Sequence, residues 1–158
     1  TGHTQAAGYG LVGSAERGDR RLLLVLNGLE TSRSRAQESL RLMDWGFNNF
    51  QLVDFYNQGE VVIEATTWLG KQERVKLSSQ KDISISIPKT HISDMKVEIL
   101  VEEPIPTPIS INDQVGLVQI TYADKKLQFP LIAYEDIEQK GFFSRIASAL
   151  KYLLLGSS

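Results

Sequence analysis

The chain has 158 residues, of which 42% are hydrophobic and 23% are charged. That balance is typical of a globular protein with a buried core, and it excludes disorder as the main state. The formal net charge of −2 argues against a nucleic-acid binder that works by neutralising phosphates. The absence of cysteine excludes disulfide scaffolds, thiolate metal sites and cysteine nucleophiles, and two histidines, His3 and His91, are too few for a zinc site.

The first thirty residues predict a β-hairpin. A run at 9–15 and an apolar run at 22–26 flank the polar tripeptide Arg17-Gly18-Asp19, and we expect the second strand to be buried on both faces. The tripeptide invites an adhesion interpretation, but glycine and aspartate are ordinary turn residues. Unusual backbone dihedrals, or the close approach of another group, are expected at a cluster of glycines formed by Gly2, Gly8, Gly10 and Gly13.

A helical period follows, and it predicts one helix from about Ser34 to Phe50. Ser34 and Gln37 fit a capping box at its start. The apolar stripe of the helix is expected at Ala36, Leu40, Met43 and Phe47. Packing in the core and between domains, and not a ligand platform, is expected of the aromatic residues Trp45, Phe47 and Phe50.

From residue 51 to about residue 137, short strand-like runs are separated by Gly, Pro, Asn and Asp, which predicts a small antiparallel β-sandwich. The alternating prolines Pro104, Pro106 and Pro108 exclude a central strand and indicate an extended edge or a loop. Strict alternation in 83–87 places three isoleucines on one face. The expected strands are 61–65, 83–87, 96–100, 115–122 and 125–134, the last two joined as a hairpin at Ala123-Asp124-Lys125-Lys126.

The last segment, residues 138–158, changes to a helical pattern with a wide apolar face and a locally positive charge, because no acidic residue follows Glu138. It is too short to span a bilayer, so we expect an interfacial membrane anchor. The alternative is a helix that docks on the β domain or on a second copy of the chain. The proposed anchor residues are Phe142, Phe143, Ile146, Leu150, Leu153 and Leu154.

The opening residues continue in a series that resembles a known family. The sequence resembles the D-alanyl-D-alanine carboxypeptidases, the low-molecular-mass penicillin-binding proteins of bacteria, in Thr1-Gly2-His3-Thr4, Ala7-Gly8-Tyr9, the run LVGSA, Gly28, Arg35, Glu38-Ser39 and Trp45-Gly46-Phe47. The resemblance implies an α+β fold. Residues 1–50 would be the C-terminal part of a β-lactamase/transpeptidase-like catalytic domain (hairpin plus helix), 51–137 a β-rich second domain, and 138–158 the amphipathic membrane-anchor helix.

The resemblance also implies a chemistry. In this family a serine activated by a lysine attacks the terminal D-Ala-D-Ala bond of peptidoglycan pentapeptides, and water releases the acyl-enzyme; β-lactams acylate the same enzyme. Three motifs build that site: Ser-x-x-Lys, Ser-x-Asn and Lys-Thr-Gly. Thr1 and Gly2 match the second and third residues of Lys-Thr-Gly.

By this resemblance the Thr1 hydroxyl would hold the terminal carboxylate of the substrate, and Gly2 would let the substrate backbone lie against the strand edge. The backbone N–H of His3 would be an oxyanion-hole donor, which is its expected catalytic role. Arg35 matches the family arginine that binds the same carboxylate, for which a forked guanidinium is well suited. No metal and no cofactor are expected.

The expected nucleophile is absent from this chain. A lysine should precede Thr1, and the missing N-terminal part of the catalytic domain, with Ser-x-x-Lys and Ser-x-Asn, is the first expected partner. Ser78 and Lys81 do spell Ser-x-x-Lys, but we expect them in a polar loop and interpret the match as chance. Alone, the chain is expected to be inactive. Glu102 and Glu103 are interpreted as solvated loop charges beside Pro104, and His91 as a surface residue.

The leading hypothesis is therefore part of a carboxypeptidase in the bacterial periplasm, peripheral on the outer face of the cytoplasmic membrane. Its expected partners are the peptidoglycan pentapeptide, β-lactams and the membrane surface, with no nucleic acid. The alternative is a non-catalytic β-sandwich binding or scaffold module with a membrane-associating helix. A β-lactamase shares Lys-Thr-Gly but does not usually carry a second β domain and an anchor.

Overall fold

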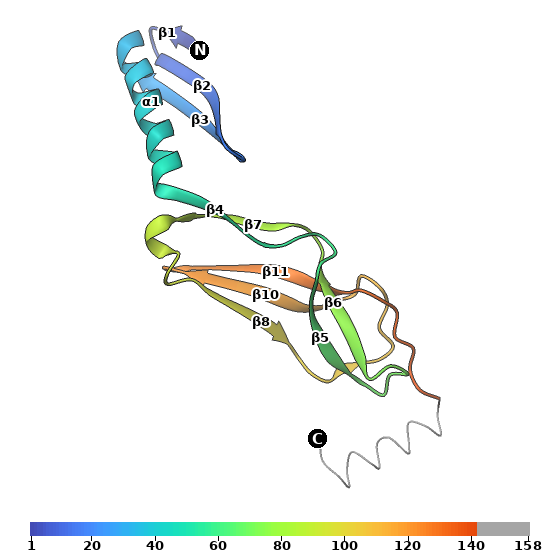
Figure 1. Cartoon of the computed structure of the whole chain (residues 1–158). Helices are drawn as coiled ribbons and strands as arrows, with labels where there is room; N and C mark the ends of the chain where they lie inside the picture. Colours follow the sequence, from blue (N-terminus) through green and yellow to red (C-terminus); the bar gives the residue numbers. More distant parts are fainter. Residues whose placement is uncertain (142–158) are drawn as a thin grey trace. The chain divides into compact units, whose positions relative to one another are not determined.

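The structure is a computed structural model, which describes residues 1–141 and divides the chain into two compact units (Figure 1). Unit 1 comprises Thr1–Val53 and Ile85–Ser93, and unit 2 comprises Asp54–Ser84 and the described residues from Asp94 onward. The chain leaves and re-enters unit 1 within two strands, β4 (Phe50–Tyr56) and β7 (Ile83–Pro88), which pair as a two-stranded sheet. The proposed anchor residues lie outside the described residues.

Unit 1 contains a three-stranded antiparallel sheet in the order β1-β2-β3. Its strands are β1 (Gly2–Thr4), β2 (Gly8–Arg17) and β3 (Arg20–Leu29), and a short 3-10 helix, η1 (Lys89–His91), belongs to the same unit. The predicted hairpin and its turn are confirmed. The prediction that its second strand is buried on both faces is wrong, because burial alternates along β3 and leaves Leu23 and Val25 76% and 72% exposed.

The helix α1 (Ser32–Asn49) begins two residues earlier than predicted because a different residue caps it. Thr31 is the N-cap: the Ser34 N–H donates to the Thr31 hydroxyl, and the Thr31 N–H donates to the Ser34 hydroxyl. This reciprocal pair satisfies two backbone donors that the first turn leaves open. The helix ends where Phe50 takes an extended backbone and starts β4.

The helix packs on β2 and β3 in Figure 1, with a face rotated from the predicted stripe. Phe47 is buried as expected, and Gly46 lets β3 approach closely, since an added Cβ there would lie 2.8 Å from Leu22 Cδ1. Ala36 and Leu40 are exposed, so their predicted core positions are wrong. Trp45, which was also expected in the core, is 52% exposed and meets Phe50 edge to face at 5.1 Å.

Unit 2 is built on a six-stranded sheet in the order β8-β10-β11-β6-β5-β9, antiparallel except for the parallel pairing of β9 with β5. Ile105 and Pro106 form the outer strand β9, which confirms an extended edge in the proline-rich piece. The strands expected from the sequence did not include β4 or β6. The bounds are β5 (Val61–Trp68), β6 (Arg74–Ser79), β8 (Lys96–Val101), β9 (Ile105–Pro106), β10 (Gln114–Tyr122) and β11 (Lys125–Ala133).

The predicted hairpin of β10 and β11 is confirmed, and its second strand begins at Lys125 as expected. Tyr122 pairs directly with Lys125, so only Ala123 and Asp124 form the turn, and Ala123 takes a left-handed backbone with φ +47°. The two lysines therefore already belong to β11. The alternation predicted for β7 is confirmed, because its three isoleucines are buried while the residues between them are exposed.

The core of unit 2 is made of residues from most of its strands, and its fully buried large side chains are Leu77, Ile83, Ile120, Leu131, Ile137, Val75 and Val118. The described chain is thus mostly β-sheet with one α-helix, which fits the predicted β-sandwich. Among the described residues no helix is both long and apolar enough to cross a membrane. The predicted C-terminal helix falls outside the part of the chain that the structure describes.

Candidate functional site

The first three residues lie along the free edge of the sheet in unit 1. β1 is an edge strand of the described sheet, since it pairs with β2 and has no neighbour on its other side. Thr1, Gly2 and His3 are all exposed. An exposed edge leaves backbone N–H and C=O groups available to an extended ligand, so this edge is a place where a peptide can add as a further strand.

Tyr9 brings two of the predicted site residues together. In the antiparallel register His3 stands opposite Tyr9, and their ring centroids are 4.0 Å apart at an angle of 33°. The guanidinium carbon of Arg35 lies 5.5 Å from the centre of the same Tyr9 ring. Edge strand and helix therefore meet at one aromatic ring, which belongs to the family resemblance but for which the sequence predicted no role.

Arg35 is held on the first part of α1 by several local hydrogen bonds. Its backbone N–H donates to the Thr31 carbonyl at 3.0 Å, and its Nη2 donates to the Ser32 hydroxyl at 3.2 Å. The Ser39 hydroxyl donates to the Arg35 carbonyl at 2.7 Å. Arg35 itself is half-buried. The packing against Tyr9 and these bonds restrict the guanidinium, so less conformational entropy remains to be lost when it binds an anion.

The electrostatics at this place favour a negatively charged ligand. The first turn of this described helix contains no acidic side chain, and the helix N-terminus carries a partial positive charge. Arg35 adds a full positive charge four residues into the helix. A carboxylate is the anion whose geometry the guanidinium fork matches best among side-chain and peptide groups.

The glycine cluster has a structural cause at Gly8 but none at Gly2. Gly8 has φ +67°, and a Cβ added there would lie 2.8 Å from the Leu29 carbonyl oxygen. A Cβ added at Gly2 would meet no atom within 4 Å. The described chain therefore needs glycine at position 8, whereas any need for it at position 2 has to come from a group that binds against β1.

The Ser78–Lys81 match does not lie in a polar loop as predicted. Ser78 and Ser79 are part of β6, and they are only 2% and 1% exposed. The Ser79 hydroxyl donates to the Lys81 carbonyl. Ser78 belongs to unit 2, whereas β1 and α1 belong to unit 1.

Glu103 is more than a solvated loop charge. Its carboxylate accepts hydrogen bonds from both the hydroxyl and the backbone N–H of Thr66, each at 2.6 Å. These bonds, the hydroxyl first, hold the pKa of Glu103 below its ordinary value because they favour the charged form. They tie the segment before β9 to β5. His91 lies in η1 and is half-buried.

One face of the β2–β3 hairpin is apolar and uncovered in the described structure. Val12 stands directly opposite Val25, and Ser14 opposite Leu23. The three apolar side chains are 69–76% exposed. The opposite face of the same hairpin is covered by α1. Among the described residues, no group of three His, Cys, Asp or Glu side chains is arranged to hold a metal ion.

Comparison with known proteins assigns the chain to one family. Residues 50–139 match the family described as penicillin-binding protein 5, C-terminal domain. The chain is 32% identical over 154 residues to the D-alanyl-D-alanine carboxypeptidase DacD of Salmonella typhimurium, covering 96% of this chain and 40% of that protein. With DacA of Escherichia coli K12 it is 32% identical over 155 residues, covering 97% of this chain and 38% of the relative.

Solved structures agree. Penicillin-binding protein 5 from Haemophilus influenzae superposes with a TM-score of 0.78 at 30% identity, over 87% of this chain and 41% of that one. The carboxypeptidase DacD from Francisella tularensis gives a TM-score of 0.66 at 30% identity, over 88% and 35%. The chain spans about two fifths of the length of the relatives it matches. The resemblance noted in the sequence is thus confirmed, and the chain belongs to the penicillin-binding protein 5 C-terminal domain family.

Proposed function

We propose that this chain is part of a serine-type D-alanyl-D-alanine carboxypeptidase, which removes the terminal D-alanine from peptidoglycan pentapeptides through an acyl-enzyme. The relatives named above are D-alanyl-D-alanine carboxypeptidases, and they match the chain over more than nine tenths of its length. In this proposal residues that precede Thr1 supply the lysine of Lys-Thr-Gly and the serine that is acylated by substrate and by β-lactams.

The observation that carries the proposal is the stack of His3, Tyr9 and Arg35. It joins the edge strand that begins with Thr-Gly to a guanidinium that is restrained beside a helix N-terminus. A substrate that ends in a carboxylate needs both an edge along which its backbone can lie and a cation at its end. This arrangement supplies both from one unit of the fold.

At this edge of unit 1, each of the predicted site residues would have a distinct role. The Thr1 hydroxyl and the Arg35 guanidinium would bind the terminal carboxylate, and Gly2 would leave room for the substrate backbone. The His3 N–H would donate to the oxyanion that forms when the serine attacks the peptide carbonyl. None of these roles breaks a bond, so the chain by itself would position the substrate without hydrolysing it.

The uncovered apolar face of the hairpin supports a larger catalytic domain. Val12, Leu23 and Val25 are large apolar residues that lie exposed on one face of a sheet, and a sheet normally buries its apolar face against another element. We propose that residues preceding Thr1 cover this face and complete the sheet as part of the catalytic domain. The β-rich unit 2 would then be the second domain, beyond the catalytic one.

We further propose a periplasmic location with a peripheral membrane anchor in residues 142–154. The support is the sequence: apolar residues alternate with Arg145 and Lys151 at helical spacing. The test is co-sedimentation of the full 158-residue chain with anionic lipid vesicles, compared with a chain ending at Lys140. Equal retention of the two chains, or no retention of either, would show that this segment is not the anchor.

The catalytic proposal is tested on the protein extended upstream of Thr1 as its gene encodes it. We expect intact-mass analysis after incubation with penicillin to show one added penicilloyl group. We also expect D-alanine to be released from a peptide that ends in D-Ala-D-Ala. The 158-residue chain is the matched control and should show neither. If the extended protein shows neither as well, the chain is a non-catalytic binding or scaffold module.

A further inference from the structure

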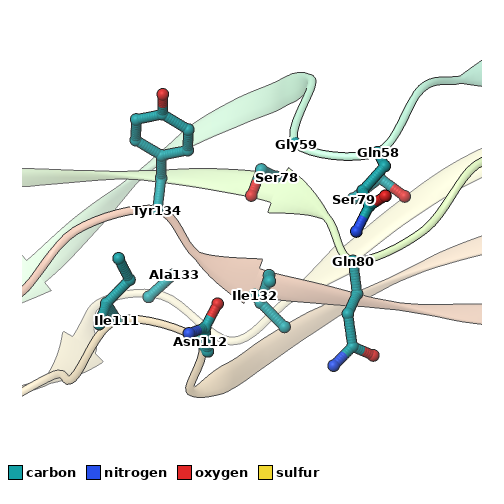
Figure 2. Close-up of a pocket in the computed structure, with 10 residues that line it drawn as sticks. All are labelled: Gln58, Gly59, Ser78, Ser79, Gln80, Ile111, Asn112, Ile132, Ala133 and Tyr134. Carbon is teal, nitrogen blue, oxygen red and sulfur yellow. The ribbon is translucent and has the colours of Figure 1, made fainter.

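Unit 2 carries a hollow of about 510 Å³ on its surface, where β6 and β11 meet two loops (Figure 2). The strand register places Ser78 opposite Ile132 in its floor. The Gly59 N–H donates to the Ser79 carbonyl at 2.8 Å, and the Asn112 N–H donates to the Ala133 carbonyl at 2.9 Å. Because backbone hydrogen bonds fix both loops to the sheet, the hollow is formed before anything binds.

A buried hydroxyl faces this hollow. Ser78 is only 2% exposed, and its hydroxyl has no hydrogen-bond partner among the described residues. No side-chain polar atom in the described part of the chain is both cut off from solvent and unpaired. The Ser78 hydroxyl therefore keeps some contact with solvent, and Ser78 is one of the residues that line the hollow. A hydroxyl that has no protein partner and is reached by solvent is free to pair with a ligand that enters the hollow.

The other polar groups that line the hollow are neutral. The side-chain amides of Gln58, Gln80 and Asn112 make no hydrogen bond within the described residues, and each offers both donors and an acceptor. None of the described residues that line the hollow is charged. A charged ligand would lose its water there without gaining a counter-charge, so the lining selects against ions.

An aromatic ring and an aliphatic side chain complete the wall. Tyr134 is 50% exposed and Ile111 is 51% exposed. In Figure 2 these two lie toward one end of the hollow and Gln58 and Gln80 toward the other, with Ser78 between them. A ligand that fits this lining has an apolar face as well as many neutral hydrogen-bonding groups.

We propose that this hollow binds a neutral oligosaccharide. Sugar hydroxyls and acetamido groups pair with amide and hydroxyl side chains, and the C–H face of a pyranose ring covers an exposed aromatic ring. An extended peptide fits less well, because β6 and β11 are both paired on their two edges and offer no free strand edge. The proposal lies in unit 2 and does not depend on the proposed catalytic function.

The test is a titration of the full 158-residue chain with chitotetraose, a neutral tetrasaccharide of N-acetylglucosamine. Binding is measured by calorimetry and by the changes in amide chemical shifts. We expect saturable binding, with the shifts concentrated at the residues of the hollow. The affinity should be the same at low and high salt, because no charge pairs form. Tyr134→Ala should weaken binding about tenfold, equivalent to ~1.4 kcal/mol, and Ser78→Ala by about threefold.

Trp45→Ala is the matched control, because Trp45 is a similarly exposed aromatic residue at 52% but belongs to unit 1. It should bind chitotetraose like the parent chain, and circular dichroism should show that all variants are folded. The proposal is overturned if the parent chain shows no saturable binding, or if Trp45→Ala loses as much affinity as Tyr134→Ala. Binding of a neutral tetrapeptide with the same dependence on Tyr134 would also overturn it, in favour of a peptide site.

Discussion

The guanidinium carbon of Arg35 lies 5.5 Å from the centre of the Tyr9 ring, and the His3 ring lies against the same ring, with its centroid 4.0 Å away. Tyr9 is thus the contact through which a residue of α1 and a residue of β1 are held at one place. A cation over an aromatic face gains roughly 0.5–1 kcal/mol at an exposed site. Tyr9 is therefore expected to position Arg35 without touching the substrate.

This relationship predicts a graded effect on the proposed carboxypeptidase extended upstream of Thr1. Arg35→Ala should raise KM for a D-Ala-D-Ala peptide at least tenfold, because a charge-assisted hydrogen bond contributes roughly 1.5–3 kcal/mol. Tyr9→Leu should raise KM by about two- to fivefold and change kcat less, since it only loosens the arginine. Steady-state kinetics with Arg33→Ala, an exposed neighbour on α1, is the control. Equal losses in Arg33→Ala and Arg35→Ala would contradict a specific role for Arg35.

Gly2, the first residue of β1, and Gly8, the first residue of β2, should respond differently to substitution by alanine. Gly8→Ala places a Cβ 2.8 Å from the Leu29 carbonyl oxygen at a positive φ, and it should destabilise unit 1 by more than about 1 kcal/mol. Gly2→Ala meets open space and should leave stability unchanged. Urea unfolding followed by circular dichroism measures both. A large loss in Gly2→Ala would mean that the chain itself needs this glycine.

The bonds between Thr66 and Glu103 predict a dependence of stability on pH. The Thr66 hydroxyl and N–H lower the pKa of Glu103 in the folded state. The contribution of Glu103 to the free energy of unfolding is therefore present above the ordinary pKa of 4.5. It is lost as the pH falls through the lower folded-state pKa. Glu103→Gln should therefore reduce stability at pH 7 and cost little at about pH 3.

Urea unfolding at the two pH values measures this difference. Glu102→Gln is the matched control, because Glu102 is the preceding residue in the chain and is exposed. It should have no comparable effect at either pH. If Glu103→Gln were equally destabilising at both pH values, the charge of Glu103 would not be the cause.

The uncovered hairpin face predicts how the 158-residue chain behaves alone. Val12, Leu23 and Val25 should bind an apolar dye and promote self-association. The double variant Leu23→Ser/Val25→Ser should reduce dye binding and self-association in the chain alone. The same double variant should destabilise the protein extended upstream of Thr1. Dye fluorescence and sedimentation velocity measure the first effect, and thermal unfolding measures the second.

Leu100→Ser is the control for this experiment, since Leu100 is 42% exposed in unit 2. It should reduce dye binding less than the hairpin variants do, and it should not destabilise the extended protein to the same extent. If the hairpin variants stabilise the extended protein, the face is not covered there.

Local pattern determined much of the fold in advance. The hairpin turn at Arg17-Gly18-Asp19, the alternation of β7 and the edge position of Pro106 follow from turn residues, period-two burial and the missing proline N–H. The family likewise followed from short motifs in sequence order. These features depend on neighbours along the chain, so the sequence by itself was sufficient.

Tertiary structure decided which faces are covered. Leu40 has the spacing of a core residue but is exposed, because α1 turns the side with Gly46 and Phe47 toward the sheet. β6 escaped prediction because its last two residues are serines, which are buried by neighbouring strands and not by their own hydrophobicity. Both candidate sites arise from contacts between residues that are distant in sequence. One is the stack of His3, Tyr9 and Arg35, and the other is the hollow lined by Ser78. Such contacts exist only once the strands and helix have packed.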